Sequence, residues 1–163
     1  MMERTLVLLK PDAVARCLVG EIVSRFERAG LKIVGMRMAW CDKSHAMKHY
    51  TEDITIRRGE HVRNKLITFL TEGPVVALVL EGIDAVDVVR KIVGSTEPKT
   101  APPGTIRGDF AHMSYTHADS TTRALPNLIH ASGNKEEAQQ EVALWFTPQE
   151  LHSYKTVHEG QVF

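Results

Sequence analysis

The chain has 163 residues, of which 43% are hydrophobic, and this predicts one ordinary globular domain with enough apolar residues to bury its own core. Lysine plus arginine equals aspartate plus glutamate at 20 each, so no general field attracts polyanions and we expect no dedicated nucleic-acid surface. Two cysteines make no disulfide framework, no signal-peptide pattern is present, and no apolar run approaches the roughly 20 residues of a membrane span. These features predict a cytoplasmic protein without a membrane partner.

The first third of the chain alternates strand and helix patterns. A continuous apolar run over residues 5–9 predicts a buried strand, and apolar residues at helical spacing predict one helix over 13–29 that Gly30 ends. Alternation over 32–41 predicts a second strand. The residues on one face of that strand are Val34, Met36, Met38 and Trp40.

The middle of the chain predicts helices around another strand. Ser44 is placed to cap a short helix that continues to Tyr50, and a second helical pattern over 62–70 stops at Gly73-Pro74. Residues 75–80 form the next apolar run and predict a buried strand. Asp84 then predicts the cap of a helix that ends near Gly94.

The last part of the chain begins with a loop. Residues 95–111 are rich in proline and glycine and have no period, which predicts an irregular, functional segment. A short strand over 128–130 follows, and Asn134 predicts the cap of a helix through Phe146. The polar tail, 147–163, is expected to pack along the surface.

This order of elements favours an α+β fold. It suits a ferredoxin-like β-α-β-β-α-β sandwich, in which helices pack on one face of a four-stranded antiparallel sheet. The pattern alone leaves a doubly wound parallel sheet open. We expect the whole chain, 1–163, to form a single domain.

Three segments carry residues suited to phosphate chemistry. His130 follows two apolar residues and precedes a turn, so a mostly neutral imidazole can stand at a sheet edge and attack an electrophile. Lys10 follows the first strand, and Arg107 lies between Gly104 and Gly108, where its fork suits bidentate phosphate contact. The chain has no P-loop and no protein-kinase motif set.

Together these segments resemble nucleoside diphosphate kinases over about residues 4–146. The likeness rests on Lys10-Pro11-Asp12, on the run Gly104-Thr105-Ile106-Arg107-Gly108-Asp109-Phe110, and on Asn127-x-x-His130-x-Ser132. It implies the ferredoxin-like fold and transfer of the γ-phosphate of nucleoside triphosphates to nucleoside diphosphates by a ping-pong mechanism through phosphohistidine at His130. It also implies Mg²⁺ held by the nucleotide phosphates rather than by protein ligands, and a homo-oligomer, expected to be a hexamer.

The resemblance assigns the catalytic roles residue by residue. It implies that Lys10 contacts the transferred phosphate and that the Tyr50 hydroxyl orders Lys10 and His130. We expect Glu141 to accept the Nδ1–H of His130, and Ser132 to hold that carboxylate.

The nucleotide-binding roles follow in the same way. The resemblance implies that Arg90 and Thr96 contact the β-phosphate, that Arg107 binds phosphate, and that Asn127 contacts the ribose 3′-hydroxyl. Val62 and Leu66 are expected to contact the base.

Two departures from the family pattern stand out. Val62 occupies the position of a base-stacking phenylalanine, which weakens stacking unless His61 substitutes. Residues 111–126 form an inserted segment, expected to pack on a neighbouring subunit. A metal site there would use His112, His117 and Asp119.

Two other functions remain open at this point. The chain could be a nucleotide-binding module without turnover, which only the missing phenylalanine supports. It could also be a phosphohistidine relay that passes phosphate to another protein, which would need a docking surface.

Overall fold

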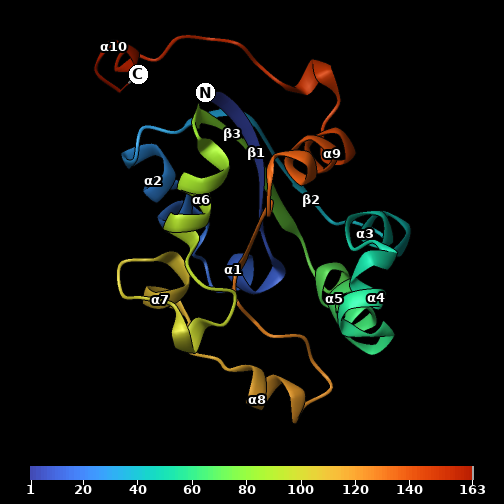
Figure 1. Cartoon of the computed structure of the whole chain (residues 1–163). Helices are drawn as coiled ribbons and strands as arrows, with labels where there is room; N and C mark the ends of the chain where they lie inside the picture. Colours follow the sequence, from blue (N-terminus) through green and yellow to red (C-terminus); the bar gives the residue numbers. More distant parts are fainter. Residues whose placement is uncertain (163) are drawn as a thin grey trace.

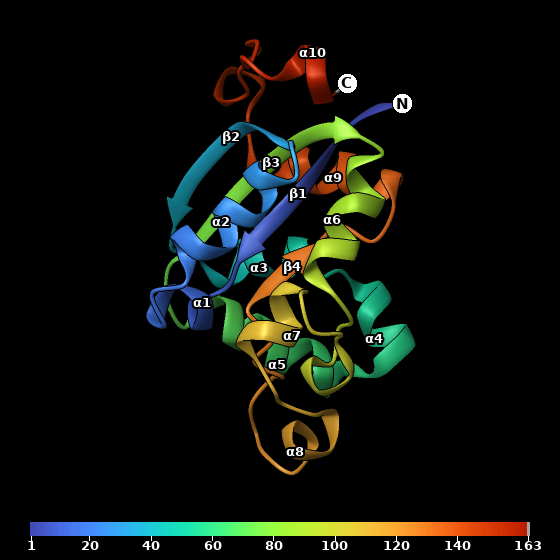
Figure 2. The same ribbon diagram turned by 90° about the vertical axis from the view of Figure 1, so that its left-hand side faces the viewer.

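The protein, a computed structural model that describes residues 1–162, is built on a four-stranded sheet (Figures 1 and 2). The strands lie in the order β2-β3-β1-β4, and each pairs with its neighbour in antiparallel fashion. This confirms the predicted antiparallel α+β sheet and excludes the doubly wound parallel sheet. The strands are β1 (Met2–Leu9), β2 (Lys32–Ala39), β3 (Val75–Ile83) and β4 (Ile129–Ala131).

Helices fill the connections between the strands. The longer ones are α2 (Val19–Arg28), α5 (Glu60–Thr71), α6 (Ala85–Val93) and α9 (Lys135–Trp145). The shorter ones are α1 (Pro11–Ala15), α3 (Lys43–His49), α4 (Glu52–Arg58), α7 (Ile106–Phe110), α8 (Tyr115–Asp119) and α10 (Glu159–Val162), with 3₁₀ turns η1 (Pro98–Thr100) and η2 (Pro148–Glu150). Among the described residues, no helix has both the length and the apolarity needed to cross a bilayer.

Helices cover both faces of the sheet, which corrects the expectation of a single covered face. The core on one face joins the sheet to α2 and α6, and the core on the other joins it to α3, α5 and α9. The reason lies in the central strands, because residues 5–9 and 75–80 are buried at every position. A strand that is apolar on both faces requires cover on both.

The register brings two predicted site residues together. β4 pairs only with the C-terminal end of β1, and His130 lies directly across from Leu8. Lys10 follows β1 by one residue, and its backbone N–H donates to the Leu128 carbonyl at 2.8 Å. The topology therefore places Lys10 and His130 at the same end of the sheet, although 120 positions separate them in the chain.

The helix predicted over 13–29 is two helices. α1 ends at Ala15 and α2 begins at Val19. Between them Cys17 adopts a left-handed conformation with φ of 57°, which no α-helix can contain. The apolar spacing is continuous across this break, so the pattern could not reveal it.

Strand β2 also departs from its pattern. A bulge between Ile33 and Gly35 shifts the register, so Val34 is buried whereas the following apolar residues are not. Met36, Met38 and Trp40 are 52%, 61% and 68% exposed, and they form an apolar stripe along the edge strand β2 and the residue that follows it.

Helix caps are partly as predicted. Asn134 caps α9 by accepting from the Glu137 N–H at 2.8 Å, which confirms that prediction. The cap of α3 is Asp42 rather than Ser44, and Asp84 lies at the start of α6 without a side-chain cap bond. The last strand begins one residue later than predicted, because Leu128 has φ of 70° and cannot extend it.

The described part of the tail, 147–162, packs on the exposed edge of β2. The Tyr154 hydroxyl donates to the Ile33 carbonyl at 2.6 Å, and the His152 N–H donates to the Val34 carbonyl at 2.8 Å. Lys32 also donates to the Tyr154 carbonyl. The tail thus satisfies edge groups of β2 that would otherwise face solvent.

Removing a large side chain from β3 tests this account of the core. Leu78 is fully buried, so Leu78→Ala should lower the free energy of unfolding by about 2–5 kcal/mol, measured by urea denaturation. Ile56 on α4 is 83% exposed, and Ile56→Ala should change it by less than about 0.5 kcal/mol. Equal effects of the two substitutions would contradict the described core.

Candidate active site

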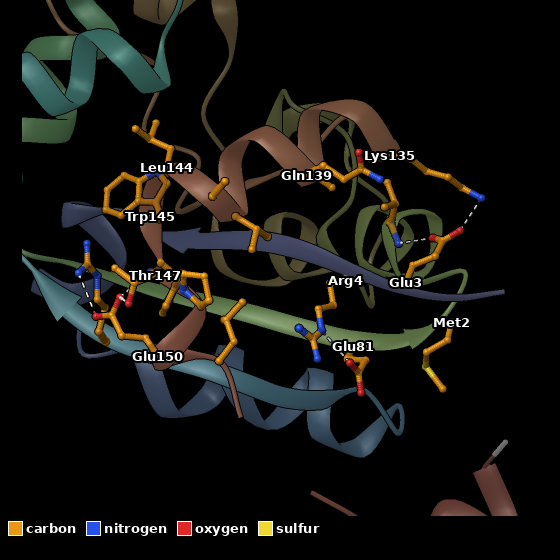
Figure 3. Close-up of a pocket in the computed structure, with 18 of the residues that line it drawn as sticks. Met2, Glu3, Arg4, Glu81, Lys135, Gln139, Leu144, Trp145, Thr147 and Glu150 are labelled. Carbon is orange, nitrogen blue, oxygen red and sulfur yellow. Dashed lines mark hydrogen bonds and ion pairs between the residues drawn. The ribbon is translucent and has the colours of Figure 1, made fainter. Parts of the chain in front are cut away.

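Two hollows in the surface differ in their charge. The larger, of about 850 Å³, lies beside α9 and the start of β1 (Figure 3). Its charged side chains are already paired with one another, as Lys135–Glu3, Arg4–Glu81 and Arg37–Glu150. Such a hollow leaves no uncompensated cation for a phosphate.

The smaller cleft, of about 390 Å³, lies at the end of the sheet where His130 and Lys10 meet. No carboxylate belongs to its lining among the described residues. Its basic members are Lys10, Arg58, Arg90, Arg107 and His130, and its other lining residues include Tyr50, Leu66, Thr96 and Asn127. An excess of cations at a cleft wall attracts anions.

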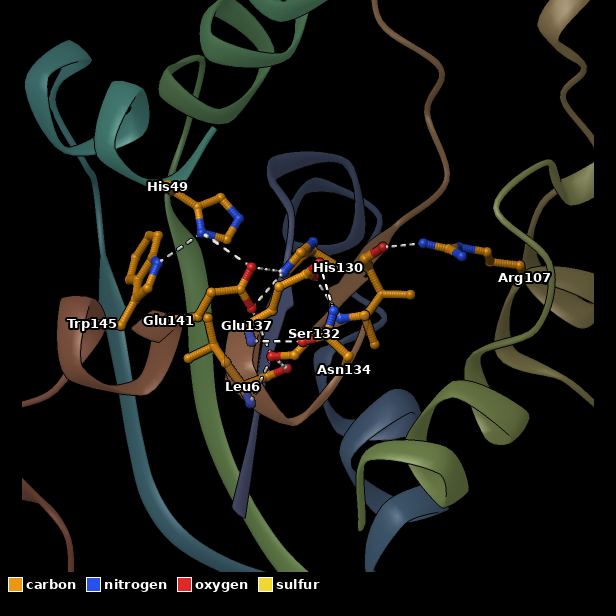
Figure 4. Close-up of polar contacts among 11 residues, drawn as sticks. Leu6, His49, Arg107, His130, Ser132, Asn134, Glu137, Glu141 and Trp145 are labelled. Carbon is orange, nitrogen blue, oxygen red and sulfur yellow. Dashed lines mark hydrogen bonds and ion pairs between the residues drawn. The ribbon is translucent and has the colours of Figure 1, made fainter. Parts of the chain in front are cut away.

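His130 is held through one ring nitrogen (Figure 4). Its Nε2 lies 2.9 and 3.0 Å from the two carboxylate oxygens of Glu141. Ser132 donates its hydroxyl to the same carboxylate at 2.6 Å, which agrees with its expected position. The expectation that Nδ1 would bind Glu141 is wrong, because the ring orientation on β4 turns Nε2 toward α9.

The ionisation of Glu141 fixes the tautomer. Burial opposes its negative charge, but His130 first, and then His49 and Ser132, hold the pKa of Glu141 below its usual range. An ionised carboxylate only accepts hydrogen bonds, so Nε2 carries the ring proton. The lone pair of the neutral imidazole therefore resides on Nδ1, which has no hydrogen-bond partner within residues 1–162.

His49 is a site residue that the sequence reasoning missed. Its ring is buried and packs edge-on against His130, with centroids 4.5 Å apart at 85°. Trp145 donates its Nε1–H to the Nδ1 of His49 at 3.3 Å (Figure 4). Burial, with a further contribution from His130, lowers the pKa of His49 to about 3, so this ring is neutral at physiological pH.

Lys10 is buried at the centre of the cleft. Its ammonium donates to the Asn127 side-chain oxygen and lies 4.9 Å from the Phe69 ring centroid. Burial lowers the pKa of Lys10 to about 8; the Asp12 charge partly opposes this and the Arg107 charge adds to it. Lys10 is therefore a poorly solvated cation that an anion would stabilise.

The rest of the Lys-Pro-Asp motif holds the backbone before β4. Asp12 accepts the Leu128 N–H at 2.9 Å, and this contact supports the left-handed Leu128. Asn127 donates its amide to the Thr96 carbonyl at 2.8 Å. The motif thus links the end of β1 to both the segment before β4 and the loop that follows α6.

Arg107 lies in α7 rather than in the expected loop, and it is buried. Its guanidinium donates to three backbone carbonyls, those of Asn127 at 3.1 Å, Gly94 at 3.1 Å and Ile129 at 2.5 Å. Burial lowers the pKa of Arg107 to about 10, which still leaves it charged at pH 7. Three of its five N–H groups are used in this way, so two remain for a ligand.

The other predicted residues also lie at the cleft. Tyr50 is buried in its wall, and burial followed by the Glu141 charge raises the pKa of its hydroxyl. No hydrogen bond joins that hydroxyl to Lys10 or His130 within the described chain. Arg90 and Thr96 are exposed lining residues, and Arg58 at the end of α4 is a lining residue that the sequence reasoning did not find.

Val62 and Leu66 line a third hollow, of about 80 Å³. It adjoins the cleft of about 390 Å³ that holds Lys10 and His130, which is called the main cleft from here on. His61 belongs to the lining of neither space and lies against Gly59 instead. Val62 and Leu66 therefore lie beside the cleft, whereas His61 does not.

The inserted segment folds back on its own chain. α8 begins at Tyr115, whose backbone N–H donates to Glu97 at 2.8 Å, and Lys65 donates to the Thr121 carbonyl at 2.9 Å. His112, His117 and Asp119 do not come together as metal ligands. Among the described residues, the one group of at least three candidate ligands is His49, His130 and Glu141.

Comparison with known proteins identifies the family. The family model described as nucleoside diphosphate kinase matches residues 3–151. The chain belongs to the nucleoside diphosphate kinase family. The kinase of Pyrococcus horikoshii is 53% identical over 152 residues, covering 93% of this chain and 90% of its own, and that of Borreliella burgdorferi is 46% identical over 156 residues, covering 95% and 93%.

Solved nucleoside diphosphate kinases share the fold. A Borrelia burgdorferi enzyme with bound vanadate and ADP, a transition-state mimic, superposes with a TM-score of 0.95 at 46% identity, covering 97% of this chain and 95% of that one. A Halobacterium salinarum enzyme in complex with CDP has a TM-score of 0.85 at 38% identity, covering 100% and 99%. This chain is accordingly a phosphotransferase of the nucleoside diphosphate kinase family.

The buried Lys10 charge predicts a pH-dependent stability. Between about pH 8 and pH 10.5 the unfolded chain holds a proton on Lys10 that the folded chain has lost, so this residue makes unfolding less favourable as the pH rises. Below pH 8 its charge destabilises the fold. Lys10→Met should therefore raise the free energy of unfolding at pH 7 by roughly 2–3 kcal/mol, and the gain should shrink toward pH 10.5.

Urea denaturation of the parent and Lys10→Met over this pH range provides the measurement. Lys43→Met, at the exposed start of α3, is the control for loss of a lysine. A Lys10→Met protein no more stable than the parent at pH 7 would contradict the burial of an uncompensated charge.

Proposed function

We propose that this chain transfers the γ-phosphoryl group of nucleoside triphosphates to nucleoside diphosphates in two half-reactions through phosphohistidine at His130. The observation that carries the proposal is the contact of Glu141 with Nε2, which leaves the lone pair of His130 on Nδ1 at the wall of a basic cleft. Family membership supports the same reaction class.

In the first half-reaction, Nδ1 attacks the γ-phosphorus and the bond from that phosphorus to the β–γ bridging oxygen breaks. The diphosphate leaves with the bond electrons. The phosphorylated ring retains its Nε2–H and carries a positive charge, which the Glu141 carboxylate balances. In the second half-reaction, a terminal oxygen of another diphosphate attacks the phosphorus, and the N–P bond returns its electrons to Nδ1.

The cations have separate tasks in this proposal. Lys10 contacts the transferred phosphoryl group, because its ammonium is buried beside the wall that carries His130. Arg90, Thr96 and the two free N–H groups of Arg107 bind the leaving phosphates. The Tyr50 hydroxyl stays protonated and donates to the phosphoryl group. Ser132 positions Glu141.

The remaining contacts hold the nucleoside and the metal. Asn127 contacts the ribose 3′-hydroxyl together with Lys10, and Val62 and Leu66 contact the base. Mg²⁺ enters as part of the substrate, because the described lining of the cleft offers it no carboxylate and the nucleotide phosphates supply oxygen ligands. Its charge offsets that of the transferring phosphate.

Two alternatives are less well supported. A binding module without turnover would not need Ser132 and Glu141 to orient a histidine, yet both contact points are formed. A relay to another protein requires a docking surface, whereas the groups around His130 suit a small anion. We also propose a cytoplasmic protein whose residues 1–163 form one domain, with 111–126 as an insertion and 147–163 as a tail.

Phosphate exchange tests the proposed reaction directly. With Mg²⁺ and ATP labelled at the γ-position, the parent should label several nucleoside diphosphates, and His130→Ala should lower the rate by roughly 10³-fold or more. His152→Ala, an exposed histidine in the tail, should retain the parent rate. The phosphoprotein formed without acceptor should contain Nδ1-phosphohistidine.

Each outcome separates the alternatives. Nucleotide binding without exchange would establish the module, and label that leaves to a protein but not to nucleoside diphosphates would establish the relay. Nε2-phosphohistidine would overturn the assignment of the attacking nitrogen.

We expect a homo-oligomer, and a hexamer from the family. The exposed apolar stripe of Met36, Met38 and Trp40 supports association, because an apolar patch on the surface favours contact with another chain. Light scattering should give a mass six times the 18.2 kDa of one chain. The double variant Met36→Glu/Met38→Glu should give a smaller mass, whereas Ile56→Glu should leave it unchanged. A monomeric parent at micromolar concentration would contradict the expectation.

A further inference from the structure

The main cleft continues into the smaller hollow. Five residues line both spaces, and they are Lys10, Arg58, Leu66, Thr96 and Asn127. The main cleft holds the phosphate-binding cations and His130, so a nucleotide bound there extends toward the hollow with its nucleoside. What lines the hollow therefore contacts the base, provided that the proposed function holds.

The hollow offers an aromatic surface that this chain lacks at Val62, where the family pattern has a phenylalanine. Among its described lining residues, Tyr115 is the one aromatic side chain. Tyr115 is half-buried at the first position of α8, in the inserted segment. A valine side chain makes only van der Waals contact with a base, whereas an aromatic ring stacks on the π-face that every base has.

The backbone around Tyr115 is firmly placed. Its N–H donates to Glu97 at 2.8 Å, and Ser114 caps α8 by accepting from the His117 N–H at 3.2 Å. The Lys99 N–H donates to the Met113 carbonyl at 3.0 Å. These contacts join α8 to the loop that follows α6, which forms one wall of the cleft.

The opposite wall reaches the same segment. Lys65 on α5 donates to the Thr121 carbonyl just after α8, and the Arg58 guanidinium lies 5.2 Å from the centroid of the Tyr115 ring. The insertion therefore bridges the two walls at the outer end of the cleft, and α8 occupies the far end of the molecule in both views (Figures 1 and 2).

We propose that Tyr115 is the base-stacking residue of this enzyme, and that the inserted segment 111–126 carries the stacking contact that Val62 cannot make. The hollow of about 80 Å³ holds only two or three waters, so a base enters when Arg58 leaves the Tyr115 ring. Arg58 also lines the main cleft, where the nucleotide phosphates give its charge a new partner. Base binding thus exchanges a cation–π contact for a stacking contact.

Nucleotide affinity tests this proposal. Dissociation constants for ADP, GDP, CDP and UDP are measured by calorimetry for the parent, Tyr115→Ala and Tyr115→Phe. Tyr115→Ala should weaken binding about tenfold to a hundredfold, most for the purines, whose π-faces are larger. Tyr115→Phe retains the ring and should restore affinity to within about threefold of the parent. Tyr154→Ala, in the tail, controls for loss of a tyrosine.

A ligand without a base separates stacking from a structural role. Ribose 5-diphosphate should bind the parent and Tyr115→Ala alike. An equal loss for this ligand and for ADP would mean that Tyr115 only supports the fold of the cleft. Tighter ADP binding by Tyr115→Ala would mean that the ring blocks the base. Either result overturns the proposal.

The measurement does not depend on turnover. The same binding series in a His130→Ala background should give the same ratio of affinities, because Tyr115 acts on binding alone. If the parent shows no phosphate exchange but still binds ADP more tightly than Tyr115→Ala by the expected factor, the proposed reaction is wrong and the assignment of Tyr115 as the stacking residue is retained. If the parent exchanges phosphate but Tyr115→Ala binds ADP as tightly as the parent, Tyr115 is not the stacking residue.

Discussion

The site depends on positive charge that is buried without a matching negative charge. Burial lowers the pKa of both Lys10 and Arg107, and no carboxylate lines the cleft between them among the described residues. Backbone carbonyls and the Asn127 amide, which are dipoles rather than charges, hold these cations in place. The folded protein therefore retains the unfavourable desolvation energy of these cations. A bound phosphate would offset that energy, and the offset would contribute to the free energy of binding. A carboxylate partner would stabilise the free protein and weaken its attraction for phosphate.

The two nearby carboxylates have other tasks, since Asp12 accepts from the Leu128 backbone N–H and Glu141 serves His130. Glu141 lies behind His130 and accepts from Nε2 and from the Ser132 hydroxyl, so its charge acts on the ring rather than on the substrate. His49 completes this arrangement as a neutral ring whose Nδ1 is occupied by Trp145. In the proposed reaction, a second cation beside His130 would disfavour the positive charge of the phosphorylated ring. The low pKa of His49 prevents this.

The sequence patterns predicted those features of the structure that depend on neighbouring residues alone. The strands β1 and β3, the Asn134 cap and the position of His130 follow from hydrophobic runs and cap chemistry. The resemblance brought Glu141 and Ser132 to the same site. The ring nitrogen that faces Glu141 depends on how β4 pairs with β1, which no spacing encodes. The break at Cys17 and the bulge in β2 leave the apolar pattern intact and change only the backbone.

The polar helices were missed for a related reason. α4 buries no residue and α8 buries only Ala118, so neither has the apolar stripe that identifies a helix from sequence. Both stand at the outer end of the cleft, where Ser114 caps α8 and the Arg58 guanidinium of α4 lies against the Tyr115 ring of α8. α4, which has neither a buried residue nor a side-chain cap, can move at low cost when a ligand enters, whereas hydrogen bonds hold the backbone of α8 in place. In the proposed complex, α4 therefore yields to the entering nucleoside and α8 presents Tyr115 to the base, while the cations beneath, anchored to the central strands, keep the phosphates in one place.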